Sequence, residues 1–231
     1  MSRPFDAMSE ELRSSILRMG GCCEAILDKA IRALNERNVD LADEVREDDL
    51  DIDRLDLEVD SRVLNALALQ APVASDLRMV LAAKMIATDL ERVGDIARNI
   101  AKSARRISKK DVRVPLPSTL SPLAVASQRA LRRALDAYTR SDAELAREVL
   151  RDDDVIDEQQ DSVVRRLLRD LEANPEAASQ EVDAILVAKN LERVADHATN
   201  IAEQVIYAAS GVVVRHQEEG WVEVAPDNGP A

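Results

Sequence analysis

Two stretches of this chain carry carboxylates at a spacing that suits metal binding. Asp49 and Asp53 are four residues apart, and so are Glu91 and Asp95. In an α-helix, residues four apart lie on the same face, so each pair places two carboxylates next to one another. Like charges at this spacing repel each other, and a multivalent cation with oxygen ligands is one way to offset that repulsion.

Both motifs occur twice in the sequence. LERVGDIARNIA at 90–101 and LERVADHATNIA at 191–202 are identical at nine of twelve positions, and LADEVREDDLDID at 41–53 matches LAREVLRDDDVID at 145–157 at eight of thirteen. Residues kept in both copies are requirements of the repeated unit. The sequence therefore predicts two acidic metal sites, one formed by Asp49, Asp53, Glu91 and Asp95 and the other by Asp153, Asp157, Glu192 and Asp196.

An ordinary ion-pair network is the alternative for these acids. Glu44 and Asp48 form a rival repeated pair in the same stretch, with Glu148 and Asp152 as their counterparts. Carboxylates beside an apolar seam need compensation, because removing them from water is costly. Arginine side chains could supply it in place of a metal, and the candidates are Arg92, Arg98 and Arg193. We favour the metal because acidic pairs recur on neighbouring helices in both copies.

The two copies also differ at positions next to the acids. His197 stands where the first copy has Ile96, and it is either a nitrogen ligand for one site or a histidine on the helix surface. Asp89 becomes Asn190 in the second copy. The two sites therefore need not have equal charge or equal affinity for a cation.

The elements that must position these side chains are helices. Hydrophobic residues make up 46% of the 231 residues but aromatic residues only 2%, which is typical of helical bundles. Apolar residues recur at intervals of three and four, and Gly20 and Gly21 interrupt the first such seam at a point where we expect close helix approach. This periodicity predicts helices at about 6–37, 39–69, 73–106, 119–139, 141–172 and 176–209.

We therefore predict an all-α fold of two tandem three-helix bundles related by the internal repeat, with no sheet. The first bundle covers residues 5–107, a proline-rich linker 108–118, and the second bundle 119–210. The tail at 211–231 has too little apolar surface to form a domain, and we expect part of it to be disordered.

Charge and composition exclude several classes of function. A formal net charge of −13 argues against nucleic-acid binding, which needs a basic surface. The chain lacks a signal peptide and any run of 18 apolar residues, so we expect a cytoplasmic protein that does not insert into membranes. Neither copy has the Glu-x-x-His pairs of a di-iron oxidase, and no phosphate-binding glycine loop, Gly-x-Ser-x-Gly elbow or Cys-x-x-Cys pair occurs. We therefore expect no catalytic site.

The tandem three-helix units and the doubled Leu-Glu-Arg-Val-x-Asp motif resemble the PhoU family of phosphate-transport accessory and regulatory proteins, over about residues 5–210. The resemblance implies two similar helical bundles with multinuclear metal sites, in which iron, zinc, magnesium and manganese are all plausible occupants. It also implies a negative regulator of phosphate uptake and of the phosphate-starvation response, acting between the phosphate ABC transporter and a sensor histidine kinase. We expect the protein to be a homodimer.

A competing interpretation from another class is a carboxylate-bridged two-metal phosphohydrolase. Such an enzyme needs a sheltered pocket with a general base or a phosphate clamp beside its metals. A third interpretation is a purely structural helical scaffold without metal. Metal analysis separates the third from the other two, and phosphoester turnover by the metal-loaded protein separates the enzyme from the regulator.

Overall fold

The computed structural model describes residues 4–110, 114–217 and 220–224, and nearly all of them are helical. The prediction of an all-α core is confirmed. The first unit contains three helices, α1 (Pro4–Glu36), α2 (Val39–Gln70) and α3 (Ser75–Ser108). The second unit contains α4 (Leu120–Arg140), α5 (Ala143–Arg151), α6 (Asp153–Ala173) and α7 (Ala178–Ser210), with a short 3-10 turn, η1 (Pro175–Ala177), before α7.

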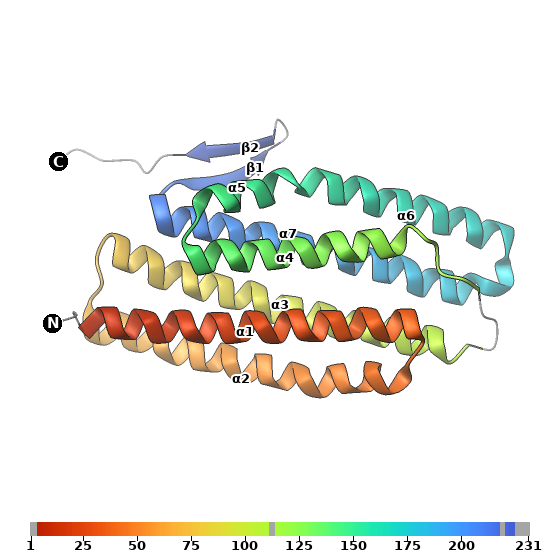
Figure 1. Cartoon of the computed structure of the whole chain (residues 1–231), viewed down its shortest axis with the longest axis horizontal. Coiled ribbons are helices and arrows are strands. Elements are labelled where there is room, and N and C mark those ends of the chain that lie inside the picture. The colour runs from red at the N-terminus through yellow and green to blue at the C-terminus, as the bar shows by residue number, and fades with distance from the viewer. Residues whose placement is uncertain (1–3, 111–113, 218–219, 225–231) are drawn as a thin grey trace.

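The stretch predicted as one helix at 141–172 is two helices, α5 and α6. Asp152 separates them, and its backbone N–H is shared between the carbonyl groups of Glu148 and Val149. The break is one residue long, so α6 continues along the same side of the bundle (Figure 1). This break falls directly before Asp153, which is one of the predicted metal ligands.

All the long helices run along one axis of the molecule (Figure 1). Within the first unit α1, α2 and α3 pack against each other, and within the second unit α7 packs against α4, α5 and α6. The two units meet along α3 and α7 and, to a smaller extent, along α1 and α4. As a result α2 and α5–α6 lie at opposite edges of the molecule (Figure 1).

Equivalent residues begin the second helix of each unit. The side chain of Asn38 accepts hydrogen bonds from the backbone N–H groups of Asp40 and Leu41. Asp142 accepts the same two bonds at the start of α5. Both are N-caps that satisfy backbone donors left without helical partners. The repeat therefore sets where these helices begin, and with it the position of the acids that follow.

Helices α3 and α7 pack antiparallel, and their contacts fix the register between the units. Arg106 on α3 pairs with Asp183 on α7, with 2.6 Å between nitrogen and oxygen. Near the middle of both helices, Asp89 Oδ1 lies 2.8 Å from His197 Nδ1. This register brings the middles of the two repeated motifs opposite each other, so the units are related by an approximate two-fold axis that crosses α3 and α7.

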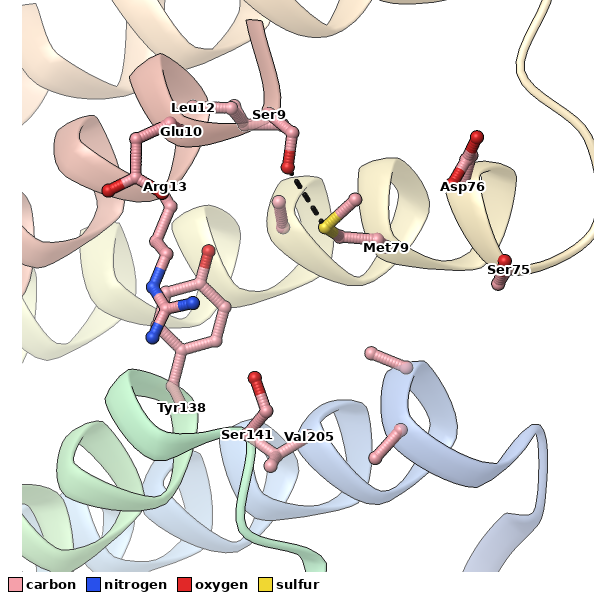
Figure 2. Close-up of a pocket in the computed structure, with 13 residues that line it drawn as sticks. Ser9, Glu10, Leu12, Arg13, Ser75, Asp76, Met79, Tyr138, Ser141 and Val205 are labelled. Carbon is pink, nitrogen blue, oxygen red and sulfur yellow. Dashed lines mark hydrogen bonds between the residues drawn. The ribbon is translucent and has the colours of Figure 1, made fainter. Parts of the chain in front are cut away.

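A pocket at one end of the interface between the units is lined by residues from α1, α3, α4 and α7 (Figure 2). Ser9 donates a hydrogen bond to the sulfur of Met79 over 3.2 Å. Arg13 donates to the backbone carbonyl of Thr139, which joins α1 to α4. Burial raises the pKa of Tyr138 to about 12, so its hydroxyl stays protonated in this setting.

The connection between the units contacts both of them, and Arg37 of the first unit donates to the carbonyl of Val114 over 2.7 Å. The side-chain amide of Gln180 donates to the carbonyl of Val114 over 2.6 Å and accepts from its N–H over 3.3 Å. The linker was predicted from residue 108, and α3 continues through that position. Residues 111–113 of the predicted linker lie outside the described part.

The prediction that the chain contains no sheet is wrong. Strands β1 (Val213–Gln217) and β2 (Gly220–Val224) form an antiparallel hairpin that packs on α7. Val214 is buried, and Arg147 on α5 pairs with Glu223 on β2. These contacts, a second ion pair between Arg215 on β1 and Glu203 on α7, and the packing of Trp221 on the core hold a segment that its composition did not mark as structured. The other tail residues, 218–219 and 225–231, lie outside the described part.

Within the described ranges, no helix combines the length and the apolar character needed to cross a membrane.

The two adjacent glycines of α1 differ in their surroundings. A Cβ atom at Gly20 would lie 2.7 Å from a methyl carbon of Leu135, so α1 and α4 do approach closely there. A Cβ atom at Gly21 would meet nothing within 4 Å. Close helix approach is therefore confirmed for one of the two positions.

We expect Gly21→Ala to raise the free energy of unfolding by about 0.5–1 kcal/mol, because alanine is the better helix former and has open space. Gly20→Ala should instead lower it by roughly 1 kcal/mol, because the added methyl group overpacks the contact with Leu135. Urea unfolding of both variants beside the parent protein measures the difference. Equal shifts in both variants would show that the close approach has no energetic effect.

Candidate metal centres

The first predicted cluster lies between α2 and α3. Asp49 and Asp53 are one turn apart on α2, next to Ile52, which is fully buried. Glu91 and Asp95 occupy the facing turns of α3, and Asp49 is only 2% exposed. Burial raises the pKa of Asp49, and the nearby Asp53 and Asp95 raise it further. Carboxylates of both helices thus lie near one another, but no three of these four described residues bring ligand atoms within 4.8 Å of each other.

Arg98 compensates part of this charge. One of its terminal nitrogens lies 2.7 Å from an oxygen of Asp49, and the other lies 2.6 Å from an oxygen of Asp95. The guanidinium group opposes the effect of burial on the pKa of Asp49. Glu91 is not part of this bridge, and burial followed by the charge of Asp95 raises its pKa. The guanidinium group of Arg98 therefore neutralises part of the negative charge of the first cluster.

Gly94 makes room for this arrangement. A Cβ atom at Gly94 would lie 2.7 Å from Oδ1 of Asp49 and 3.1 Å from Cδ1 of Ile52. Any larger residue at this position would push the buried carboxylate away from α3. The second copy has Ala195 at the equivalent position. This difference is visible in the repeated Leu-Glu-Arg-Val-x-Asp motif.

The second predicted cluster lies between α6 and α7. Asp153, Asp157 and Asp196 can each bring one carboxylate oxygen within 4.8 Å of the other two. Burial, followed by the charges of Asp196 and Asp157, raises the pKa of Glu192 to about 7, while Lys189 opposes the shift. All four predicted residues of this cluster are thus close enough to interact. Among the described residues, no other group of three metal-ligating side chains comes this close together.

The position of Arg98 is occupied by Thr199 in the second copy. The hydroxyl group of Thr199 donates 2.7 Å to the backbone carbonyl of Asp196 and carries no charge. The second cluster therefore lacks the guanidinium bridge that the first one has. Its three close oxygens suit a hard cation, since such ions take several carboxylate oxygens at short range.

The rival acidic pairs are structural. Lys29 on α1 lies 2.9 Å from Glu44 and 2.6 Å from Asp48. Arg133, at the equivalent position of α4, pairs with the counterparts of these two acids, Glu148 and Asp152. The ion-pair alternative is therefore right for these pairs. The sequence could have shown this, because Lys29 and Arg133 stand at equivalent positions of the two copies and provide the positive charges.

His197 turns toward the first unit. Its Nδ1 lies 2.8 Å from Asp89 on α3, and Asn200 donates to the same Asp89 oxygen over 3.1 Å. It is not among the three side chains whose ligand atoms converge in the second cluster. The imidazole ring therefore belongs to the interface between the units.

Comparison with known proteins points to one family. The family model for the PhoU domain matches residues 16–104 and 120–205. The phosphate-specific transport system accessory protein PhoU homolog of Pseudomonas aeruginosa is 35% identical over 216 residues, which cover 94% of this chain and 89% of that protein. The homolog from Caulobacter vibrioides is 36% identical over 200 residues, covering 87% of each chain.

Solved structures agree with this. The crystal structure of PhoU from Pseudomonas aeruginosa superposes with a TM-score of 0.87 at 34% identity, covering 90% of this chain and 99% of that one. The phosphate transport system regulatory protein PhoU from Streptococcus pneumoniae gives a TM-score of 0.82 at 26% identity, covering 91% of this chain and 99% of that one. The family model ends at residue 205, so the hairpin β1–β2 lies outside it.

The raised pKa of Glu192 predicts how the metal-free protein responds to pH. Its folded pKa of about 7 lies above the unfolded value of about 4.5, so the folded state binds a proton more tightly. The stability contributed by this proton is complete below about pH 4.5 and is lost as the pH rises through about 7. In the presence of a chelator, Glu192→Gln should therefore unfold at a higher temperature than the parent protein at pH 8, and the two should converge near pH 4.5.

Glu144→Gln is the matched control, because Glu144 is exposed and lies outside the cluster. Melting temperatures from pH 4.5 to pH 8 measure the effect. If the control and Glu192→Gln follow the same curve, Glu192 carries no unbalanced charge.

Proposed function

Because the chain belongs to the PhoU family, we propose that it restrains phosphate uptake and the phosphate-starvation response, as a metal-binding adaptor between the phosphate ABC transporter and a sensor histidine kinase. Its curated relatives are named as accessory proteins of phosphate-specific transport, which supports an accessory role in phosphate transport for this chain. The observation that carries the proposal is the match of the family model to both halves, each of which contains one of the acidic clusters.

The adaptor is proposed to act by contact and without chemistry of its own, in the cytoplasm and as a homodimer. Its formal net charge of −13 gives it a surface that suits basic partners. The cytoplasmic faces of membrane proteins are enriched in lysine and arginine, so they offer such a complement. The fold supports this role because the long helices α2 and α6 at its edges offer extended surfaces for docking.

Metal ions are proposed to bind at both clusters. Asp153, Asp157, Glu192 and Asp196 would hold one ion or group of ions, and Asp49, Asp53, Glu91 and Asp95 would hold the other. Shells built from carboxylates accept iron, zinc, magnesium and manganese, with supply and geometry deciding between them. The bound cation would supply the positive charge that a row of half-buried carboxylates requires.

The two clusters should differ in affinity. A cation entering the first cluster must displace Arg98, which bridges Asp49 and Asp95. A cation entering the second cluster meets the uncharged hydroxyl group of Thr199 at the same position. We therefore propose that the second cluster fills first.

Exchanging these two residues tests the order of filling. Thr199→Arg should weaken metal binding at the second cluster by at least about tenfold, because it places a positive charge beside the ion. Arg98→Thr should strengthen binding at the first cluster by a similar factor, for the opposite reason. Isothermal titration with Mn²⁺, together with elemental analysis of protein purified without chelator, measures both.

The double exchange is the matched control, since it keeps the composition and should reverse the order of the two sites. If neither single exchange changes the affinity or the number of bound ions, the assignment of these carboxylates to metal is wrong.

The regulatory role predicts a clear phenotype. Deleting the gene should leave phosphate-starvation genes expressed in phosphate-rich medium, and the parent gene should restore repression. A gene with neutral amides at all eight acidic positions should fail to restore it if metal is needed for docking. Reporter expression in the three strains measures this, with immunoblots confirming equal protein levels.

Normal repression in the deletion strain would refute the regulatory role. Normal rescue by the eight-site variant would refute only the part played by metal. Turnover of phosphoesters by the metal-loaded protein would favour the two-metal phosphohydrolase instead.

A further inference from the structure

A polar pocket lies where the hairpin meets the interface between the units. Its lining includes Met85 and Asp89 on α3, Asn200, Glu203 and Gln204 on α7, and Arg215 on β1. The pocket stands apart from both carboxylate clusters, since it lies between α3 and α7 and not on the faces that meet α2 and α6.

Gln204 contributes a side-chain amide to the wall of the pocket. Gln204 is 5% exposed, and its side-chain amide makes no hydrogen bond to any described residue. The amide atoms of Gln204 are not fully buried, so they keep hydrogen-bonding capacity that faces the pocket. A mostly buried amide with free hydrogen-bonding capacity on a pocket wall suits a polar group that enters the pocket.

The side chains that line the pocket carry a formal net charge of −1. Asp89 and Glu203 carry two negative charges, and Arg215 carries one positive charge. The Glu203 side chain is mostly buried and pairs with Arg215, and burial raises its pKa while Asp89 raises it further. One additional positive charge in the pocket would therefore balance the lining.

A metal ion does not fit this arrangement. Asp89, His197 and Glu203 all lie within the described residues, and they are not among the side chains whose ligand atoms converge within 4.8 Å. The acceptors are spread along the pocket wall. A spread set of acceptors suits a planar group with several donors better than a spherical ion.

We propose that this pocket binds the guanidinium group of an arginine carried by a partner polypeptide. Guanidinium groups donate five hydrogen bonds in one plane, which matches two carboxylates and an amide oxygen set apart from each other. The pairing of Arg215 with Glu203 shows that the wall already accepts a group of this kind. Met85, which is half exposed, supplies an apolar surface against the flat face of the guanidinium group.

The internal repeat shows that the fold itself does not require these charges. Across the approximate two-fold axis, Asp89 corresponds to Asn190, Glu203 to Lys102, and His197 to Ile96. The equivalent position on the other side of the axis is therefore neutral or basic. The acidic pocket is a property of one side only, as a binding site for a single basic partner would be.

The test uses the full-length protein and the blocked peptide acetyl-Gly-Arg-Gly-amide. We expect a Kd on the order of 1 mM or tighter by titration calorimetry, with a shift of the Gln204 side-chain amide resonances in NMR spectra. The matching citrulline peptide, which has the same shape without the charge, should bind at least about tenfold more weakly. The matching lysine peptide should also bind more weakly, because an ammonium group donates all its hydrogen bonds from a single nitrogen atom.

Variants locate the binding to the pocket. Asp89→Asn and Gln204→Leu should each lower the affinity for the arginine peptide by about tenfold. Asp89→Asn reproduces the residue found in the other repeat, so the fold should tolerate it. Asp136→Asn is the control, since Asp136 is an exposed acid on α4 far from the pocket and gives the same change in net charge. Arg215→Gln should tighten binding several-fold by removing a competing charge.

Equal affinity for the arginine and citrulline peptides would overturn the proposal. An equal loss of affinity for the arginine peptide in Asp89→Asn and Asp136→Asn would also overturn it. Unchanged Gln204 resonances at saturating peptide would show that the peptide binds elsewhere. None of these outcomes depends on metal or on phosphate regulation, so the pocket can fail while the proposed regulatory function stands.

Discussion

The constraint on which the rest of this structure depends is the neutralisation of carboxylates placed beside apolar seams. The outer acids of each second helix are paired with a cation from the first helix of the unit, Lys29 in one case and Arg133 in the other. The inner acids face the third helix. Arg98 bridges them in the first unit, whereas Thr199 leaves them without that bridge in the second. Burial, followed by the charges of Asp196 and Asp157, raises the pKa of Glu192 to about 7. Protonation of Glu192 is one way to reduce the charge of this cluster, and the proposed bound cation is another.

The third helix of each unit has two roles that follow from its two packed faces. One face of α3 and α7 meets the second helix and carries the acidic cluster, and the other face meets the opposite unit. Asp196 points toward the cluster, while the adjacent His197 contacts Asp89 across the interface between units. The same helix therefore carries an acidic cluster on one face and the interface between the units on the other.

Much of the architecture could be predicted from sequence because it depends on local patterns. Apolar periodicity and proline stops predicted the helices within a few residues, and the repeat predicted which acids lie together. The features that were missed depend on contacts between distant segments. The hairpin forms because Val214 is buried on α7 and Glu223 reaches Arg147, which lies 76 residues away. Spacing alone also could not choose Arg98 over Arg92 as the bridge, since both lie within a turn of the acids.

The differences between the copies are as informative as their identities. Positions kept in both copies define the helices and the carboxylates, which the duplicated fold needs. Gly94 and Arg98 act together in the first copy, because the missing Cβ lets Asp49 sit buried against α3 where the guanidinium group reaches it. Ala195 and Thr199 replace both in the second copy, so that copy has no arginine at the position from which Arg98 bridges the first cluster. The two substitutions lie on one turn of the third helix, and they remove the guanidinium bridge from one copy while the helices and the carboxylates of both copies are kept.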